Sequence, residues 1–530
     1  MRAPALALVG LLASSPALAR AAEPDPHDLV LDPENAPQPT ATQPQAAPPP
    51  AVAAPGAELV VPTLALRLDS GFDTHRDGDS EVWHHDQLRG DASLALRRPG
   101  RLSASLAVRW RWRREVRDPQ HGLAPVLEPD GRGTSAAPTT TLSELDLRDA
   151  RLTLVLPADQ LLTLGVQSIR WGVSDFMMPA DLLQPQDLRS GVALGPDDAR
   201  IPTLAVRHQW VRGPWSTDLV LIPFFEPNRV EAVGGDLSLL SSAVPLVPPS
   251  LRALAAPLVD PANRDLVSRL FTQTERPAPT LANVSLGARV GASVGGADLG
   301  VSGLWGWDRV PAIDAAPTIR ELIARGIEVA ATGEGAVAEI QTAELLALLG
   351  SDEPIYRAHY ARRLSVAVDA VRYVGPVGVR LESVWSPERT LLLEDGQTVR
   401  RASLFSTLGI GGEPMGGRIA WGVEAFLQHN EVRSGERPVI VGDDFYGCAG
   451  GVAWDDAAVE GRGLTARLGG LLDAGAADVA LLPSLSWTLS GGTQLGLRAR
   501  WQVNGGSRRL SLGDLARGDD EWIAHLQQSW

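Results

Sequence analysis

The sequence predicts an all-β protein, a transmembrane antiparallel β-barrel of about 18 strands with long external loops and a disordered N-terminal leader. Three observations predict this fold. Segments of about ten residues alternate apolar and polar side chains along most of the chain. The connections between these segments alternate between short and long. Tryptophans gather near the segment ends, as they do at the two surfaces of a membrane.

Composition excludes several other classes of protein. The chain has 530 residues, 44% of them hydrophobic, yet no stretch beyond the N-terminus approaches the ~18 apolar residues of a membrane-spanning helix. Cys448 is the only cysteine, which excludes intramolecular disulfides and multi-cysteine metal sites. The net charge of −15 argues against a nucleic-acid partner.

The first 58 residues predict export followed by a flexible leader. Arg2 precedes an apolar stretch that ends in small residues, so residues 1–21 are expected to be a signal peptide. Residues 22–58 are rich in proline and alanine and cannot bury enough apolar surface to fold. We expect them to form a disordered leader that can reach a periplasmic protein partner. The barrel is expected over residues 59–530.

The alternation assigns side chains to two faces. In residues 102–112 the apolar side chains fall on one face, and Arg109 and Arg111 fall on the other. In a barrel the apolar face contacts lipid and the polar face lines the lumen. The expected strands lie near residues 60–72, 87–97, 101–115, 142–156, 160–170, 202–211, 215–225, 284–294, 297–307, 355–373, 376–386, 401–411, 417–428, 446–456, 462–472, 477–488, 493–504 and 520–530.

The strand count is tied to the position of the termini. Eighteen strands place both termini on the periplasmic side, as an even-numbered bacterial barrel requires. The strand near 446–456 is the weakest of the set, and without it the count would be odd. Sixteen strands remain an alternative if two marginal segments are loops, and a water-soluble sandwich is the alternative fold. Either barrel is wide enough that its own side chains need not fill the lumen.

Aromatic residues predict the membrane boundaries and an assembly signal. The tryptophans near expected strand ends are Trp110, Trp112, Trp210, Trp215, Trp305, Trp307, Trp385 and Trp501. Trp522, Leu526 and Trp530 share one face of the last strand, and Gln528 interrupts that face. A terminal aromatic residue on an alternating last strand is typical of chains that the barrel assembly machinery inserts into outer-membrane lipid.

Two long connections have features of their own. Residues 226–283 contain a segment with helical spacing at 262–271, and residues 317–350 suggest short helices at 319–327 and 337–349. Such loops either fold inward and narrow a pore or cap the surface, and the sequence favours neither.

The stretch after residue 169 has a distinctive pattern. It contains Trp171-Gly172, then Asp175, then Pro179-Ala180-Asp181 and Pro185-Gln186-Asp187-Leu188, with Ile201-Pro202 at the next strand. In this it resembles a poorly characterised family of Gram-negative outer-membrane porin-like barrels, over about residues 59–530. The resemblance implies a porin-like or uptake role, with charged lumen residues at Arg380 and Glu382.

The residues of this stretch also allow a direct interpretation. Its aspartates and prolines favour a chain of tight turns. We expect a constriction loop that folds inward, with Trp171 covering an apolar surface inside the mouth or at the rim. A calcium site at Asp175, Asp181 and Asp187 is the alternative, but their spacing matches no compact calcium loop.

No sequence feature indicates catalysis. The chain has no Gly-x-Ser-x-Gly, His-Glu-x-x-His, phosphate-binding loop or dinucleotide motif. His84, His85 and Asp86 form the nearest polar cluster, in an expected external loop. We therefore expect no enzyme activity, no catalytic residues, no cofactor and no bound metal.

The polar face of the expected barrel is rich in arginine. The lumen-lining candidates are Arg109, Arg111, Arg113, Arg289, Arg380, Glu382, Arg498 and Arg500. Asp91, Asp369 and Glu424 are among the fewer acids on that face. These arginines either attract anions or pair with luminal acids and stiffen the wall.

These observations predict a channel in the outer membrane of a Gram-negative bacterium. It would pass small solutes passively, with anionic solutes favoured by the luminal arginines. The alternative is a non-conducting barrel that belongs to a secretion, polysaccharide-export or motility complex, to which the leader would connect it.

Overall fold

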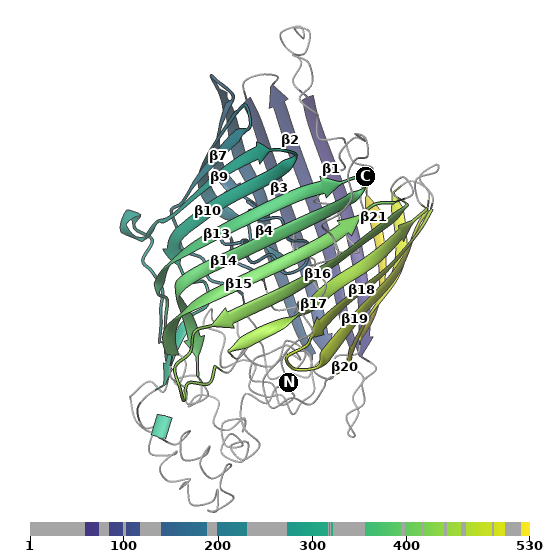
Figure 1. The fold of residues 1–530 in the computed structure, drawn as a ribbon. Coiled ribbons are helices and arrows are strands. Elements are labelled where there is room, and N and C mark those ends of the chain that lie inside the picture. Colours follow the sequence, from purple (N-terminus) through teal and green to yellow (C-terminus); the bar gives the residue numbers. More distant parts are fainter. Residues whose placement is uncertain are drawn as a thin grey trace, which may run out of the picture.

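The computed structural model confirms the predicted fold class. It describes residues 59–73, 84–98, 102–116, 139–187, 199–229, 273–315, 317, 320–321, 356–393, 398–414, 418–438, 443–456, 463–489, 492–503 and 521–529. Eighteen antiparallel strands form one sheet, in which each strand pairs with its neighbours along the chain (Figure 1). The sheet closes because β1 (Leu59–Asp73) pairs with both β2 (His84–Arg98) and β21 (Glu521–Ser529).

The other strands follow in order around the wall. They are β3 (Leu102–Val116), β4 (Thr139–Leu156), β5 (Gln160–Gln167), β6 (Thr203–Arg212), β7 (Trp215–Ile222), β9 (Ser285–Val294), β10 (Ala297–Trp307), β13 (Arg362–Val374), β14 (Val377–Leu392), β15 (Thr398–Gly412), β16 (Ile419–Asn430), β17 (Asp444–Asp455), β18 (Gly463–Asp473), β19 (Asp478–Thr488) and β20 (Thr493–Val503). Each corresponds to an expected strand, including the weakest one at 446–456.

Short turns lie at one end of the barrel. At the β9–β10 turn, Gly295 and Gly296 have φ angles of 62° and 77°, which glycine adopts without strain in a two-residue hairpin. Leu59 pairs with Arg97, so β1 begins at this same end. β21 also ends toward this end, where its last residue Ser529 pairs with Ala65 of β1 (Figure 1). Both ends of the barrel sequence therefore lie on the side of the short turns.

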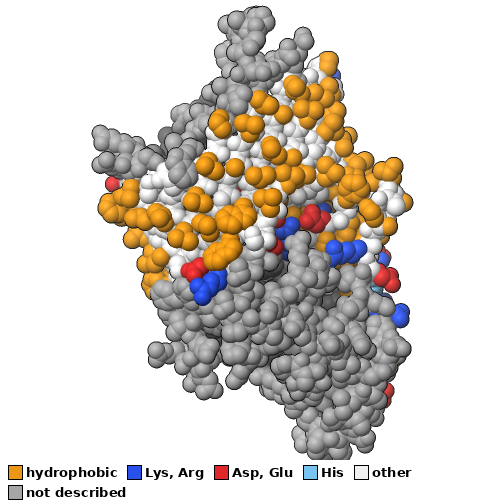
Figure 2. All heavy atoms as spheres, turned by 180° about the vertical axis from the view of Figure 1, so that it is seen from behind, with side chains coloured by type: hydrophobic (Ala, Val, Ile, Leu, Met, Phe, Trp, Pro, Cys, Tyr) orange, Lys and Arg blue, Asp and Glu red, His pale blue; other side chains and the backbone are white. Residues whose placement is uncertain are grey.

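The two faces of the wall differ in chemistry. Large apolar side chains that remain exposed recur at alternate positions, for example Leu286, Val290 and Val294 on β9. Figure 2 shows hydrophobic side chains spread over one side of the wall, with charged side chains along the lower edge of that region. Glu382, Glu424 and Arg380 lie on the opposite face and are buried. The alternation in the sequence thus corresponds to an apolar outside and a polar inside.

A charge on the outer face is expected to be costly. Val290→Arg should destabilise the barrel by roughly 2–4 kcal/mol if the position lies near the bilayer midplane, because the guanidinium would face hydrocarbon. Ser293→Arg, on the other face of the same strand, is the matched control and should be tolerated. Urea titrations of the two variants in lipid vesicles measure the difference. Equal stabilities would contradict the assignment of the faces.

The structure divides one expected strand into two elements, ends β5 at Gln167 rather than near residue 170, and adds a small sheet. The expected strand at 355–373 is two elements, because β12 (Tyr356–His359) leaves the wall and pairs with β11 (Ala312–Ala315) and β8 (Gln273–Glu275). The helices expected at 262–271 and 337–349 lie outside the described residues, as does most of that at 319–327. Within the described residues, no helix is long and apolar enough to cross a membrane. The signal peptide and the leader also lie outside them.

Candidate functional site inside the barrel

The stretch with the distinctive pattern lies inside the barrel. After Gln167 the chain leaves β5 and enters the lumen, and it rejoins the wall at β6. We call residues 168–187 the inward segment. It forms turns and extended chain rather than a helix or strand, so its backbone N–H groups need partners from elsewhere.

Two glutamates of the wall supply these partners. Glu382 on β14 accepts hydrogen bonds from the backbone N–H groups of Val173, Ser174 and Ala180, at 2.6, 3.0 and 2.5 Å. Its side chain is completely buried, with 0% exposure. One carboxylate thus ties together two turns of the inward segment, and hydrogen bonds to a charged acceptor are stronger than neutral ones.

Glu424 on β16 repeats this arrangement for the next turn. It accepts hydrogen bonds from the backbone N–H groups of Asp175 and Met177, at 3.0 and 2.9 Å, and a longer one of 3.5 Å from Phe176. The two glutamates therefore accept hydrogen bonds from six backbone N–H groups, those of residues 173–177 and 180, and hold this part of the segment against one side of the wall.

Arginines bind the three aspartates of the pattern. Arg380 contacts Asp175 at 2.6 Å, Arg200 forms a buried ion pair with Asp181, and Arg111 lies 3.4 Å from Asp187. Because each carboxylate has a different arginine partner, the three do not form one ligand set. Within the part of the chain that the structure describes, no group of three or more His, Cys, Asp or Glu is placed to hold a metal ion.

Gly172 makes the close approach to Glu382 possible. Its φ angle is 93°, and a Cβ atom at this position would lie 2.5 Å from a carboxylate oxygen of Glu382. Any larger residue would push the segment away from the glutamate. Glycine is therefore required after Trp171 in this pattern, because any side chain would collide with Glu382.

Trp171 anchors the apolar side of the inward segment. Its side chain is 2% exposed, and its indole Nε1–H donates to Asp218 on β7 at 2.9 Å. Asp218 is held in turn by Arg207 at 2.6 Å. Gly287 on β9 leaves room for the indole, because a Cβ atom there would lie 2.8 Å from the ring.

The wall behind the segment is apolar although it faces the lumen. The buried cluster consists of Ile169, Trp171, Ala180, Leu182 and Leu183 from the segment and Ala205, Val220, Ile222, Leu304, Ala367 and Val384 from the wall. The inward segment thus has one face bound by glutamates and another face packed on apolar side chains. Pro185 in the same stretch is fully buried, and its carbonyl accepts from the N–H of Ile201 at 2.9 Å.

The structure also places the lumen-lining candidates. Arg109 contacts Asp91 at 2.7 Å, Arg111 contacts Asp146 at 2.6 Å, and Arg289 contacts Asp369 at 2.6 Å. Arg113 and Arg498 are half-buried and Arg500 is buried. Of the expected assembly signal, Trp522 packs against Trp501 and Leu526 is exposed on the outer face, whereas Trp530 lies outside the described residues.

Sequence reasoning missed four contributors to the site. Glu424 was expected only as a luminal acid, and Arg200, Asp218 and Gly287 had no assigned role. One signal was available, since Val220, Leu304 and Val384 are apolar at positions where the alternation predicts a luminal side chain. An apolar patch on a luminal face indicates that another part of the chain covers it.

The ionisation of Asp175 makes the stability of the folded protein depend on pH. Burial raises the pKa of Asp175 to about 7, with Glu424 and Glu382 adding to the rise and Arg380 opposing it. Between the ordinary pKa near 3.8 and about 7, the folded protein holds a proton that the unfolded chain has released. This contribution to stability is therefore complete at low pH and is lost as the pH rises through about 7.

Asp175→Asn is expected to remove that dependence. The wild-type melting temperature should fall from pH 5 to pH 8, and the variant, which cannot ionise at this position, should show a flatter profile. Thermal unfolding in detergent at several pH values measures it, with Asp159→Asn in the β4–β5 turn as the control. Parallel profiles for wild type and Asp175→Asn would contradict the expectation.

Comparisons with known proteins show similarity of architecture. No family model matches the chain, and no curated protein matches it. The solved structure of Acinetobacter baumannii OccAB4 is similar over 90% of this chain and 98% of its own, with a TM-score of 0.44 and 6% identity. Salmonella typhi OmpF in complex with daunomycin is similar over 89% and 100%, with a TM-score of 0.40 and 7% identity. Pseudomonas aeruginosa OpdK with vanillate is similar over 88% and 99%, with a TM-score of 0.38 and 10% identity.

Proposed function

We propose that this protein is a channel that passes small solutes passively across the outer membrane of a Gram-negative bacterium. The observation that carries the proposal is the inward segment, which is fixed across the lumen by Glu382 and Glu424. A barrel of this strand number encloses space that its own wall does not fill. A rigid segment inside that space sets the size and chemistry of what can pass. The proposed role is transport rather than catalysis.

The ion pairs of the lumen bear on charge selectivity. Each of Arg109, Arg111 and Arg289 contacts a carboxylate within 2.7 Å. A guanidinium that is neutralised by a partner attracts a passing anion weakly. The contacts therefore support wall stiffening over anion selectivity for these three arginines, and we propose a channel with little charge preference.

Single-channel recording in a planar bilayer tests the proposed function. The purified full-length protein is expected to insert and give stable conductance steps in simple salt. A barrel that inserts but stays closed at all voltages would overturn the channel and favour the non-conducting component of an envelope complex. Heat-modifiable migration of the same sample establishes that the barrel is folded.

Variants of Arg289 and Asp369 test whether this ion pair stabilises the wall. Arg289→Gln leaves the carboxylate of Asp369, which is 2% exposed in its side chain, without this partner. We expect the free energy of unfolding to fall by about 3–5 kcal/mol, because removing one partner leaves an uncompensated buried charge. The double variant Arg289→Gln, Asp369→Asn removes both charges and should recover most of that stability.

The same variants separate the two roles of arginine in a conductance measurement. If Arg289 acts only through its pair, the double variant keeps the wild-type reversal potential in a salt gradient. If Arg289 attracts anions, the double variant loses anion preference although its net charge is unchanged. The second outcome would contradict the proposed lack of charge preference.

A further inference from the structure

The backbone ladder of the wall is incomplete at one place. β5 has only eight residues, and its pairing with β4 ends where Ala150 meets Val166. β4 continues outward as far as Thr139, and over residues 139–149 it pairs with β3 on one side. Among the described residues, no strand pairs with its other side there. This edge exists because the chain turns into the lumen after Gln167 instead of extending β5.

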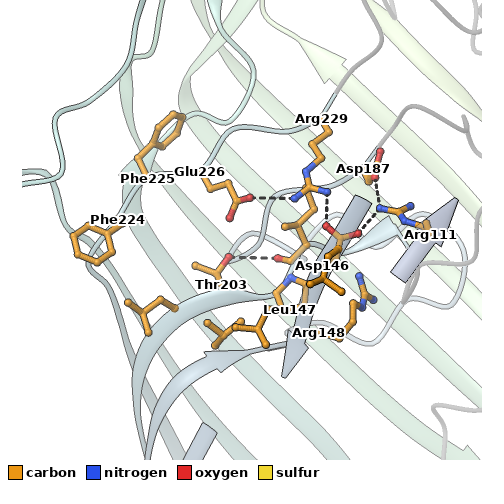
Figure 3. Close-up of a pocket in the computed structure, with 15 residues that line it drawn as sticks. Arg111, Asp146, Leu147, Arg148, Asp187, Thr203, Phe224, Phe225, Glu226 and Arg229 are labelled. Carbon is orange, nitrogen blue, oxygen red and sulfur yellow. Dashed lines mark hydrogen bonds and ion pairs between the residues drawn. The ribbon is translucent and has the colours of Figure 1, made fainter. Parts of the chain in front are cut away.

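Side chains rather than backbone hydrogen bonds connect this edge to the rest of the wall. Arg229 contacts Asp146 of β4 at 3.0 Å, and Arg148 donates to the backbone carbonyl of Arg200 at 3.0 Å. Figure 3 shows Asp146 between the guanidinium groups of Arg229 and Arg111. Such contacts can separate without breaking any β-ladder, so this part of the wall can widen at lower cost than any fully paired part.

A cavity of about 400 Å³ lies at the same place. Its lining includes Leu147, Leu204 and Phe224, which are exposed, and Leu145, which is 73% exposed. Leu147 pairs with Val108 on β3, which lies two residues before Trp110 and pairs in turn with Ala92 on β2. The apolar mouth of the cavity therefore lies at the height of the lipid-facing band, just inside the expected tryptophan boundary.

The inner part of the cavity is polar and balanced in charge. Arg111, Arg148 and Arg229 line it together with Asp146, Asp187 and Glu226. Arg229 contacts both Asp146 and Glu226, at 3.0 and 3.6 Å. Three cations and three anions give no net attraction for an ion, but they offer both hydrogen-bond donors and acceptors. A neutral polar group suits this end, and an apolar tail suits the mouth.

We propose that this cavity is a lateral portal, through which small neutral amphiphiles, such as medium-chain alcohols, pass between the lipid bilayer and the barrel interior. The volume falls in the range of about 300–1,000 Å³ that small-molecule sites occupy. The portal opens sideways between β4 and the start of β6. It is separate from the passage along the barrel axis, so it goes beyond the proposed function and does not depend on axial conductance.

Photolabelling tests the portal with a defined probe. The full-length protein in phosphatidylcholine vesicles is incubated with 3-azioctanol, a neutral alcohol whose diazirine loses N₂ on illumination and inserts into nearby bonds. Peptide mapping by mass spectrometry should find adducts concentrated at residues 145–148 and 201–204, and excess 1-octanol should suppress them. Uniform labelling around the apolar belt, unaffected by 1-octanol, would overturn the proposal.

A pair of variants on one strand sharpens the test. Leu147→Trp fills the mouth, whereas Leu152→Trp places the same side chain on the outer face of β4 beside a fully paired stretch. Leu147→Trp should reduce labelling at residues 201–204 about tenfold, which corresponds to about 1.4 kcal/mol of binding free energy. Leu152→Trp should leave labelling unchanged, and both variants should keep the wild-type conductance. Equal labelling of the two variants would refute the portal while leaving the axial channel untouched.

Discussion

Replacing Glu382 by alanine is expected to release the inward segment from the wall. The backbone N–H groups of Val173, Ser174 and Ala180 all donate to this carboxylate. Each buried N–H left without an acceptor costs about 1–3 kcal/mol, so the free energy of unfolding should fall by an amount on the order of 3–9 kcal/mol where no water replaces the carboxylate. In a channel, release of the segment should also change the size of the conductance steps and make them noisy.

Hydrogen exchange read by mass spectrometry locates this effect. Peptides that cover residues 172–181 should lose protection in Glu382→Ala, while peptides of β14 itself stay protected. Glu388→Ala is the matched control, because Glu388 lies on the same strand, is mostly exposed and contacts Arg400. Unchanged protection of the inward segment in Glu382→Ala would show that the glutamate is not its anchor.

Replacing Trp171 by alanine is expected to have the second large effect. The indole is buried among apolar side chains of β6, β7 and β14, and removal of a buried tryptophan costs about 3–5 kcal/mol. The change also leaves Asp218 without one of its donors. The segment should then be held on its glutamate side alone.

Urea titration followed by heat-modifiable migration measures the loss. Trp215→Ala is the control, since its side chain is 54% exposed at the start of β7 on the outer face. A loss in Trp171→Ala no larger than in the control would mean that the indole contributes little to the barrel. If the Trp171→Ala barrel is as stable as the wild type but has altered conductance, Trp171 positions the inward segment and does not stabilise the wall.

Strand positions could be predicted because one physical rule governs them all. A strand with lipid on one side and water on the other must alternate, and every residue of β9 or β16 repeats that requirement. The rule is local, so it needs no knowledge of distant parts of the chain. It also located the weakest strand, β17, where several glycines reduce the apolar signal.

The partners of the inward segment could not be predicted, because they depend on contacts between distant positions. The turns of residues 168–187 follow from their aspartates and prolines, but nothing local indicates that Glu382 and Glu424 receive their backbone N–H groups. The end of β5 at Gln167 could not be predicted either, because residues 168–170 continue the alternation of a strand. The chain is held inside the barrel by the packing of Ile169 and Trp171 on the luminal wall and by the hydrogen bonds to the two glutamates.

The separation between the inward segment and its glutamates has a consequence for the order of folding. Glu382 lies 202–209 residues after the groups that it binds, and Glu424 lies 247–249 residues after its own. Contacts across so long a loop form late, because the entropy of closing the loop must be overcome first. Residues 173–180 can therefore reach their final position only after β14 and β16 have joined the wall. Docking of this segment is a late step of maturation, and a chain truncated before β16 would lack half of its acceptors.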